Sequence, residues 1–462
     1  MSKVSFTPYW LDPAAGAAGA RAPHTRPLAS EVHADLAIVG GGYTGLWTAL
    51  LAAEQQRARR IVVLEAGSIA GEASGRNGGF LATSLTHGLL NGHEKFPGEI
   101  EVLEELGRQN LEEIQQTVAR YAIECDLDRR GQLRVATAQW QLAELEAAVE
   151  LGRRFGLRRE LLDSARVRQV VDSPTYVGGM LSLDDYATVH PARLAWGVAA
   201  AALSLGVEIY TASPVVGIGR DGASVVLRTP QGSVRAPRVA WATGAFRSPL
   251  RRLRHYVLPV YDYAIVTEPL PEDLAARLWR ERMPVADSGN QFHYYRLLPD
   301  RRVLFGGYDA IYHFGNRVAP ELYRRQSTFD LLARHLVETF PALAGVRVTH
   351  AWGGVIDTSS RFMAMFGRAL GGRLAYTAGF TGLGVGATRF GAKVLLDVLE
   401  GNDSALTRLE MVRRKPVPFP PEPIRYPVVR YTAWSMARAD ENDGRRNLWL
   451  RVLDRFGVGF DS

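Results

Sequence analysis

The stretch DLAIVGGGYTGLWTALLAAEQQ, residues 35–56, decides the fold. Its first five residues form an apolar run typical of a short buried strand, and the part after Gly45 has the composition of a helix. Between them, Gly40, Gly42 and Gly45 follow the spacing GxGxxG. Such a turn points the free backbone N–H groups of the helix start at a pyrophosphate. The stretch therefore predicts a dinucleotide-binding strand–turn–helix unit.

The next strand of this unit ends in a carboxylate. IVVLE, residues 61–65, is a second apolar run, and it places Glu65 twenty residues after Gly45. A carboxylate at that point accepts hydrogen bonds from a ribose diol and repels a 2′-phosphate. The pattern favours FAD or NAD over NADP. The competing interpretation is a glycine turn with an incidental glutamate at a strand end.

A second glycine-rich segment, GEASGRNGGF at residues 71–80, separates FAD from NAD. A nicotinamide cofactor needs no such loop so soon after the second strand. A flavin has a ribityl chain and a tricyclic ring that the backbone must approach closely, which glycine permits. We therefore expect FAD, against the alternative of a flexible surface loop.

Length and composition limit the other classes of protein. A chain of 462 residues is long enough for two domains. One cysteine, Cys125, excludes a disulfide framework, and no apolar run is long enough to cross a bilayer, so we expect a cytoplasmic protein without a membrane partner. The net charge of +7 comes from arginines interspersed with acids, which argues against a nucleic-acid partner. No histidine spacing indicates a metal site.

Along the chain, helical periodicity and β-type runs alternate in blocks. Residues 1–34 are rich in alanine, glycine and proline and predict an extended or loosely packed arm. Helical spacing follows at 99–121 and 138–155, and residues 256–310 contain several β-type runs. The sequence thus predicts an α/β protein with a second sheet-bearing domain.

Several motifs, in this order, resemble one family. They are GGGYTGLWTALLAA, LEAGSIAGEASGRNGG, VAWATGAF, YYRLLPDRRVLFGG, WGGVIDT and AGFTGLGVG. The set resembles the D-amino-acid oxidase/glycine oxidase superfamily, and most of all its γ-glutamylputrescine oxidoreductase-type branch. The resemblance covers about residues 30–405.

This resemblance implies an α/β fold. A discontinuous Rossmann-like FAD-binding domain in three segments would be joined to an α+β substrate domain built on a mixed sheet. The expected boundaries are 30–95, 186–250 and 350–405 for the FAD-binding domain, 96–185 and 251–349 for the substrate domain, 1–29 for an N-terminal arm and 406–462 for a C-terminal extension.

The resemblance also implies which residues contact FAD. They lie in the two glycine-rich segments, in the strand after the 193–206 helix, in the ATGA turn and in two late loops. The set is Gly40, Gly42, Tyr43, Thr44, Gly45, Glu65, Ala66, Ser74, Gly75, Arg76, Asn77, Gly78, Gly79, Val215, Thr243, Gly244, Gly353, Gly379, Thr381, Gly382, Leu383, Gly384 and Val385.

Departures from the family pattern bear on the substrate. Amino-acid-specific relatives place arginines in the segment matching 353–356 and in the late loop, where this chain has Val355, Ile356 and Thr381. A bidentate carboxylate clamp at those places is absent. We therefore expect a primary or secondary amine, or an N-substituted amino-acid derivative, as substrate. The family's attachment residues are also missing, so FAD is expected to bind non-covalently.

For the reaction, the resemblance implies hydride transfer from a C–N bond to flavin N5 and then imine hydrolysis. His293, Tyr295 and Tyr263 are the candidate catalytic residues, although alternation along a strand keeps neighbouring side chains on opposite faces. Oxygen, giving hydrogen peroxide, is the expected acceptor. The alternatives are an N-demethylating dehydrogenase serving a quinone or electron-transfer flavoprotein, and a non-catalytic FAD-binding subunit. The sequence leaves the oligomeric state open.

Overall fold

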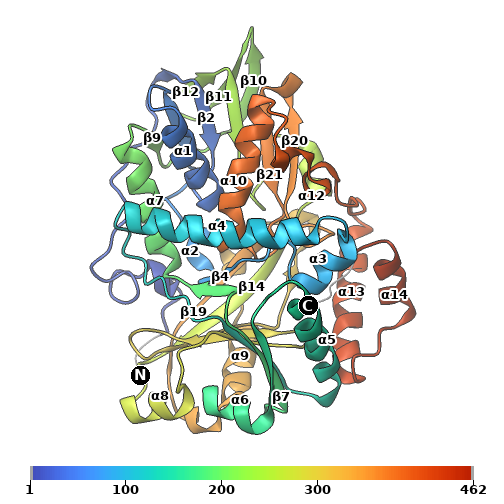
Figure 1. Ribbon diagram of the computed structural model, residues 1–462. Coiled ribbons are helices and arrows are strands. Elements are labelled where there is room, and N and C mark those ends of the chain that lie inside the picture. Colours follow the sequence, from blue (N-terminus) through green and yellow to red (C-terminus); the bar gives the residue numbers. More distant parts are fainter. Residues whose placement is uncertain (1–3, 459–462) are drawn as a thin grey trace.

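The computed structural model, which describes residues 4–458, places the strand Leu36–Val39 (β2) near the centre of a six-stranded sheet (Figure 1). Five of its strands run parallel, and β20 is an antiparallel edge. The strands come from three separated parts of the chain, as expected. Their order is β20 (Met365–Ala369), β21 (Leu374–Ala378), β13 (Arg238–Trp241), β2, β3 (Ile61–Leu64) and β9 (Glu208–Tyr210).

Alternation along β2 explains the layers on either side of this sheet. Leu36 and Ile38 pack with the helices α1 (Tyr43–Gln55), α7 (Pro191–Ser204) and α10 (Gly384–Glu400). Ala37 and Val39 pack with a four-stranded sheet on the other face. Its strands, in order, are β1 (Glu31–His33), β12 (Ser233–Ala236), β11 (Ser224–Arg228) and β10 (Gly217–Asp221).

A nine-stranded mixed sheet forms the second domain, in the lower half of Figure 1. Only the β15–β5 pairing is parallel. Its strands, in order, are β18 (Ile311–Tyr312), β14 (Leu258–Thr267), β17 (Val303–Gly307), β16 (His293–Leu297), β15 (Val285–Asp287), β5 (Gln132–Ala136), β7 (Gly178–Ser182) and β6 (Arg159–Asp163), with β19 (Val348–Thr358) paired to β14.

The two faces of this sheet have different partners. Ile265, Tyr295 and Phe305 share an apolar core with the helices α6 (Ser164–Val170), α8 (Glu272–Leu278) and α9 (Gln326–Thr339). Ala264 and Leu304, on the opposite face, join the core of the first domain. The second sheet therefore turns one face toward the nucleotide-binding domain. The remaining strands, β4 (Phe80–Ala82) and β8 (Tyr186–Thr188), pair with each other between the domains.

Two expected boundaries need correction. Strand β19 belongs to the second sheet as far as Thr358, so the last nucleotide-binding segment begins after residue 358 rather than at 350. Helix α4 (Ile100–Arg120), expected in the substrate domain, packs on α10 instead: Asn110 Nδ2 donates to the Gly386 carbonyl at 3.0 Å. Glu113 of the same helix pairs with Arg389 and Lys393.

The N-terminal arm is not loosely packed, in contrast to the expectation from its composition. Trp10 is buried, and its Nε1 donates to the Asn77 carbonyl at 2.7 Å. Ser5 N donates to the Thr349 carbonyl at 2.8 Å. The arm therefore contacts the second glycine-rich segment and the second sheet, and its aromatic residues supply the burial that periodicity did not predict.

The C-terminal extension crosses from the first domain to the second. It contains α11 (Ala405–Arg408), α12 (Glu410–Arg413), α13 (Arg425–Glu441) and α14 (Leu448–Arg455). Helix α13 is fixed to the second domain by Asp440, whose carboxylate accepts from Asn290 N and Nδ2 and from Gln291 N at 2.7–2.9 Å. Within residues 4–458, no helix has the length and apolar character needed to cross a membrane. The other helices are α2 (Ala73–Arg76), α3 (Leu89–Lys95) and α5 (Leu142–Arg154).

Candidate functional site

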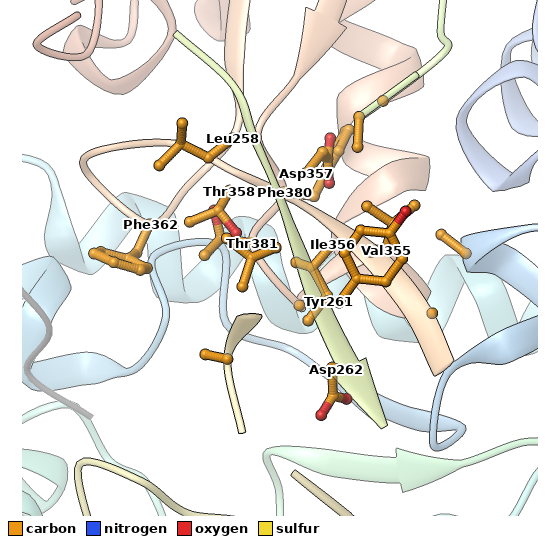
Figure 2. Close-up of a pocket in the computed structure, with 18 of the residues that line it drawn as sticks. Leu258, Tyr261, Asp262, Val355, Ile356, Asp357, Thr358, Phe362, Phe380 and Thr381 are labelled. Carbon is orange, nitrogen blue, oxygen red and sulfur yellow. The ribbon is translucent and has the colours of Figure 1, made fainter. Parts of the chain in front are cut away.

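A cavity of about 1510 Å³ lies between the two sheets and the C-terminal extension. Small-molecule sites usually measure roughly 300–1,000 Å³. The cavity is therefore large enough for a dinucleotide together with a second molecule. Figure 2 shows part of its lining, where β14 passes the end of β19 and the loop around Thr381.

One end of the cavity is built by the glycine turn. Helix α1 begins at Tyr43 with Gly42 as its N-cap, so its free N–H groups and positive dipole end face the cavity. A Cβ on Gly45 would lie 1.9 Å from the Gly40 carbonyl oxygen, which explains why this turn requires glycine. Glu65 accepts from Gly41 N at 2.6 Å and from Gly67 N at 2.7 Å. Burial nevertheless raises the pKa of its carboxyl.

The second glycine-rich segment is tied directly to the first. Tyr43 N donates to Ser74 Oγ at 2.9 Å, which holds the start of α1 against α2. Asn77 stabilises the segment from within, because its Oδ1 accepts from Gly79 N at 2.8 Å. Trp352 Nε1 donates to the Arg76 carbonyl at 2.8 Å. The segment is thus rigidly placed between the two domains.

Asp357, at the end of β19, anchors the late loop. Its carboxylate accepts from Gly379 N at 2.7 Å, and its carbonyl accepts from Thr381 N at 3.1 Å. Burial raises the pKa of this carboxyl to about 6. Asp357, Phe380 and Thr381 are labelled in Figure 2 among the residues that line this part of the cavity. Directly after this loop, α10 begins at Gly384 with its N-terminus toward the cavity.

Most of the expected cofactor-contacting residues line this one cavity. They are Gly40, Gly42, Tyr43, Thr44, Glu65, Ala66, Ser74, Arg76, Asn77, Gly78, Val215, Thr243, Gly244, Thr381, Gly382, Leu383, Gly384 and Val385. The other five lie behind the wall, where they permit close backbone packing or a positive φ. They are Gly45, Gly75, Gly79, Gly353 and Gly379.

The three candidate catalytic residues do not come together in the cavity. Tyr295 is 1% exposed, and its hydroxyl bonds to Tyr176 in the apolar core behind the sheet. His293 shares that face: its Nδ1 lies 2.7 Å from Asp287 Oδ2 and its Nε2 lies 2.9 Å from His335 Nδ1. The Tyr263 ring reaches the wall, but its hydroxyl donates to the Leu322 carbonyl at 2.9 Å. Alternation along β14 and β16 explains these placements. The three residues are therefore not kept as candidate catalytic residues.

Two other residues present polar groups on the cavity face. Tyr294 Oη donates to Asp262 Oδ2 at 2.6 Å, and both residues line the cavity. Burial raises the pKa of Asp262 to about 6, and it raises that of Tyr294 well above its usual value. Figure 2 shows Asp262 projecting from β14. Sequence reasoning missed this residue, although it is the single charged residue in the strand LPVYDYAIVT.

The C-terminal extension also lines the cavity, which the sequence did not indicate. Val429, Ala433, Trp434 and Trp449 belong to this wall. The amphipathic spacing of α14 and the two tryptophans were the available signals. The extension therefore forms part of the cavity wall beside the two sheets.

The residues present fit FAD. The glycine turn and helix start suit a pyrophosphate, and Glu65 retains acceptor capacity for a ribose. Gly78 provides a second close approach, because a Cβ there would lie 2.8 Å from the Tyr294 ring. Cys125 is buried and does not line the cavity.

Comparisons with known proteins agree with this geometry. Residues 35–398 match the family model DAO, described as FAD dependent oxidoreductase. The chain is 36% identical over 382 residues to γ-glutamylputrescine oxidoreductase of Escherichia coli (strain K12), covering 81% of this chain and 85% of that protein. It is 26% identical over 335 residues to sarcosine oxidase subunit beta of an Arthrobacter species, covering 70% of this chain and 76% of the relative.

Solved structures show the same fold. Glycine oxidase from Geobacillus kaustophilus superposes with a TM-score of 0.67 at 21% identity, over 81% of this chain and 96% of that one. L-proline dehydrogenase from P. horikoshii also gives a TM-score of 0.67, at 15% identity. The family match spans both sheets and nearly all of the cavity wall before the extension, so the chain belongs to the DAO family of FAD-dependent oxidoreductases and binds FAD.

Proposed function

We propose that this chain oxidises the C–N bond of a primary or secondary amine. The observation that carries the proposal is the Asp262–Tyr294 pair on the face of the second sheet that lines the cavity. An ionised carboxylate there attracts a cationic amine and repels a carboxylate beside the reacting carbon. The wall that holds arginines in amino-acid-specific relatives is apolar here, with Val355 and Ile356. The E. coli relative is named for the oxidation of an amine conjugate, which supports the same class.

Bound FAD supplies an acceptor for the hydride that leaves the carbon next to nitrogen. The protein residues have separate tasks. Asp262 draws the ammonium group and can take its proton, so that the nitrogen lone pair becomes available as the C–H bond breaks. Tyr294 keeps its proton and holds the carboxylate in place. Water then adds to the resulting imine, which yields a carbonyl compound and a free amine or ammonia.

Cofactor contacts are part of this proposal. The start of α1 would bind the pyrophosphate, and Glu65 the ribose. The segment from Ser74 to Gly78 would lie along the ring system, with the N-terminus of α10 near its electron-rich edge. All these elements line the same cavity. We propose that the attachment is non-covalent, because Cys125 lies away from the cavity.

An anaerobic experiment tests the proposal. FAD-loaded protein is mixed with a panel of primary amines, secondary amines and simple α-amino acids, and the visible absorbance of the flavin is followed. We expect bleaching with amines and none with simple α-amino acids. Bleaching by α-amino acids alone would contradict the proposal, and no bleaching by any compound would support a non-catalytic subunit.

We propose oxygen as the electron acceptor, with hydrogen peroxide as its product. Oxygen uptake and peroxide formed per amine oxidised distinguish this from a dehydrogenase. The sarcosine oxidase and 4-methylaminobutanoate oxidase relatives are named as oxidases, which supports the choice. A protein that bleaches with amines but is reoxidised only by a quinone analogue would instead be a dehydrogenase.

A further inference from the structure

A row of paired residues crosses the cavity face of the second sheet. The register pairs Arg134 with Ala286, Ala286 with Tyr294, and Tyr294 with Gly306. Residues paired in this way point to the same face of a sheet. The row ends at Ala264 of β14, two residues from Asp262. Arg134 therefore lies on the same face as the Asp262–Tyr294 pair, at the far side of the sheet.

The distance along this row is considerable. Four strand spacings separate β5 from β14, and at about 4.8 Å each they amount to about 19 Å between backbones. The Tyr294 ring packs against Gly306 and against Gly78, where a Cβ would lie 2.7 Å and 2.8 Å from the ring. Asp262, Tyr294, Ala286 and Arg134 nevertheless all line the one cavity. A slender, extended molecule within that cavity can therefore reach from Asp262 to Arg134.

The Arg134 end of the row carries uncompensated positive charge. Arg134 lines the cavity and is only partly exposed. Within the described part of the chain, residues 4–458, it forms no ion pair with a carboxylate. The other arginines of the cavity wall have protein partners or are exposed. A partly buried guanidinium without an anion is unusual, because its desolvation is not offset.

Two further polar groups accompany Arg134. Gln132 is two residues earlier on the same face of β5, is 6% exposed and lines the cavity. Tyr186 also lines the cavity, and its backbone carbonyl accepts from Gly131 N at 3.2 Å, which places it beside the start of β5. Burial raises the pKa of Tyr186; the Arg134 charge opposes that rise, whereas the Asp185 carboxylate, which is paired with Arg159, adds to it. Guanidinium, amide and hydroxyl donors in one place suit a carboxylate.

We propose that Gln132, Arg134 and Tyr186 form an anion-binding subsite that takes a carboxylate at the end of the substrate remote from the oxidised C–N bond. The inference rests on the proposed function, because the amine end is assumed to react near Asp262. It deepens that function by selecting elongated amines with a distant acid over simple amines. It also agrees with the missing arginines near the flavin, since the carboxylate is bound elsewhere.

A matched pair of probes tests the subsite. N-acetyl-1,4-diaminobutane and N-succinyl-1,4-diaminobutane share a free primary amine, and only the succinyl compound has a remote carboxylate. Loss of a charged hydrogen-bonding partner corresponds to about a 10- to 100-fold change in binding. We expect a KM for the succinyl compound lower by that factor in the unaltered enzyme. Arg134→Gln should abolish the preference and leave the KM for the acetyl compound within about twofold.

Charge-matched variants make the test specific. Arg130→Gln removes the same charge from an exposed ion pair with Asp128 and should leave the preference unchanged. Arg134→Lys keeps the positive charge but lacks the planar guanidinium group, so it should retain part of the preference for the succinyl compound. An equal KM for the two probes in the unaltered enzyme, or an equal effect of Arg134→Gln on both, would overturn the proposal.

A binding measurement separates this proposal from the proposed function. Glutarate, an inert dicarboxylate, is titrated into the FAD-loaded protein while its heat of binding and the flavin spectrum are followed. We expect binding that is lost in Arg134→Gln and kept in Arg130→Gln, even if no amine bleaches the flavin. Absence of glutarate binding together with a missing preference between the probes would reject the subsite while leaving amine oxidation intact.

Discussion

At the scale of single residues, Asp262 links the charge of the site to pH. Its pKa is about 6 in the fold and 3.8 in the unfolded chain, because burial disfavours the carboxylate. The folded state therefore binds this proton more tightly. The stability that it contributes is complete below about pH 3.8 and is lost as pH rises through about 6.

Replacing Asp262 should affect activity and stability in opposite ways. In Asp262→Asn, we expect kcat/KM for amines to fall by about 10²-fold, because the group that binds and deprotonates the amine is lost. The rise of kcat/KM through about pH 6 should disappear with it. The free energy of unfolding near pH 8 should be unchanged or higher, as measured by urea unfolding. Loss of activity accompanied by an equal loss of stability would point to a structural role only.

Tyr294 and Tyr295 form a natural matched pair, because they are neighbours on opposite faces of β16. Tyr294→Phe removes the donor that stabilises the Asp262 carboxylate, so the acidic limb of the kcat/KM profile should move to higher pH. Tyr295→Phe loses its hydrogen bond to Tyr176 and should cost about 1 kcal/mol of stability without moving that limb. If both variants gave the same pH profile, the assignment of Tyr294 to the cavity face would have no functional consequence.

At the scale of elements, the position of helix α13 against the second domain depends on the carboxylate of Asp440. Asp440 accepts three hydrogen bonds from the 290–291 turn, which also lines the cavity. Asp440→Ala should cost about 1.5–3 kcal/mol locally, as charged hydrogen bonds do. We expect faster limited proteolysis within the extension and a higher KM. Glu441→Gln, next along the helix in an exposed ion pair with Arg438, is the control and should change neither.

The strand–turn–helix unit has no room for a side chain at Gly45. A methyl group there would overlap the Gly40 carbonyl, so α1 must move away from β2. Gly45→Ala should therefore lower FAD affinity by at least tenfold, measured by fluorescence titration of the apoprotein. Gly98→Ala, where a Cβ meets nothing within 4 Å, is the matched control. Undiminished FAD affinity in Gly45→Ala would mean that the pyrophosphate is bound elsewhere.

At the scale of the whole molecule, the cavity is lined by both domains and the extension, so a ligand within it contacts all three. FAD present at 100 times its Kd should raise the free energy of unfolding by about 2.7 kcal/mol, observed as a higher Tm. Because we propose non-covalent binding, acid or urea should release the flavin through a size-exclusion filter. Colour that stays with the denatured chain would show a covalent bond.

Most of the nucleotide-binding turn and its strand ends could be predicted from the local sequence. Gly40, Gly42, Gly45 and Glu65 act through the backbone geometry of one short unit, so their spacing already specifies the turn, the helix start and the strand end. The departures at Val355, Ile356 and Thr381 could also be recognised in the sequence, because each is found by comparing a single position with the family pattern. A dinucleotide fold and the choice of FAD therefore followed from the sequence by itself, and the missing carboxylate clamp stays a prediction.

Only the tertiary structure decided which side chains face the cavity. Alternation showed that His293 and Tyr295 oppose Tyr294, but which face meets the first domain depends on how two sheets pack. Arg134 and Asp262 are more than a hundred residues apart, and only the strand order and register place them on one face of the second sheet. Likewise, Trp434 becomes cavity wall because Asp440 fixes α13 there. The sequence determined the cofactor through local backbone geometry, whereas long-range packing determined the part of the site that we propose selects the substrate.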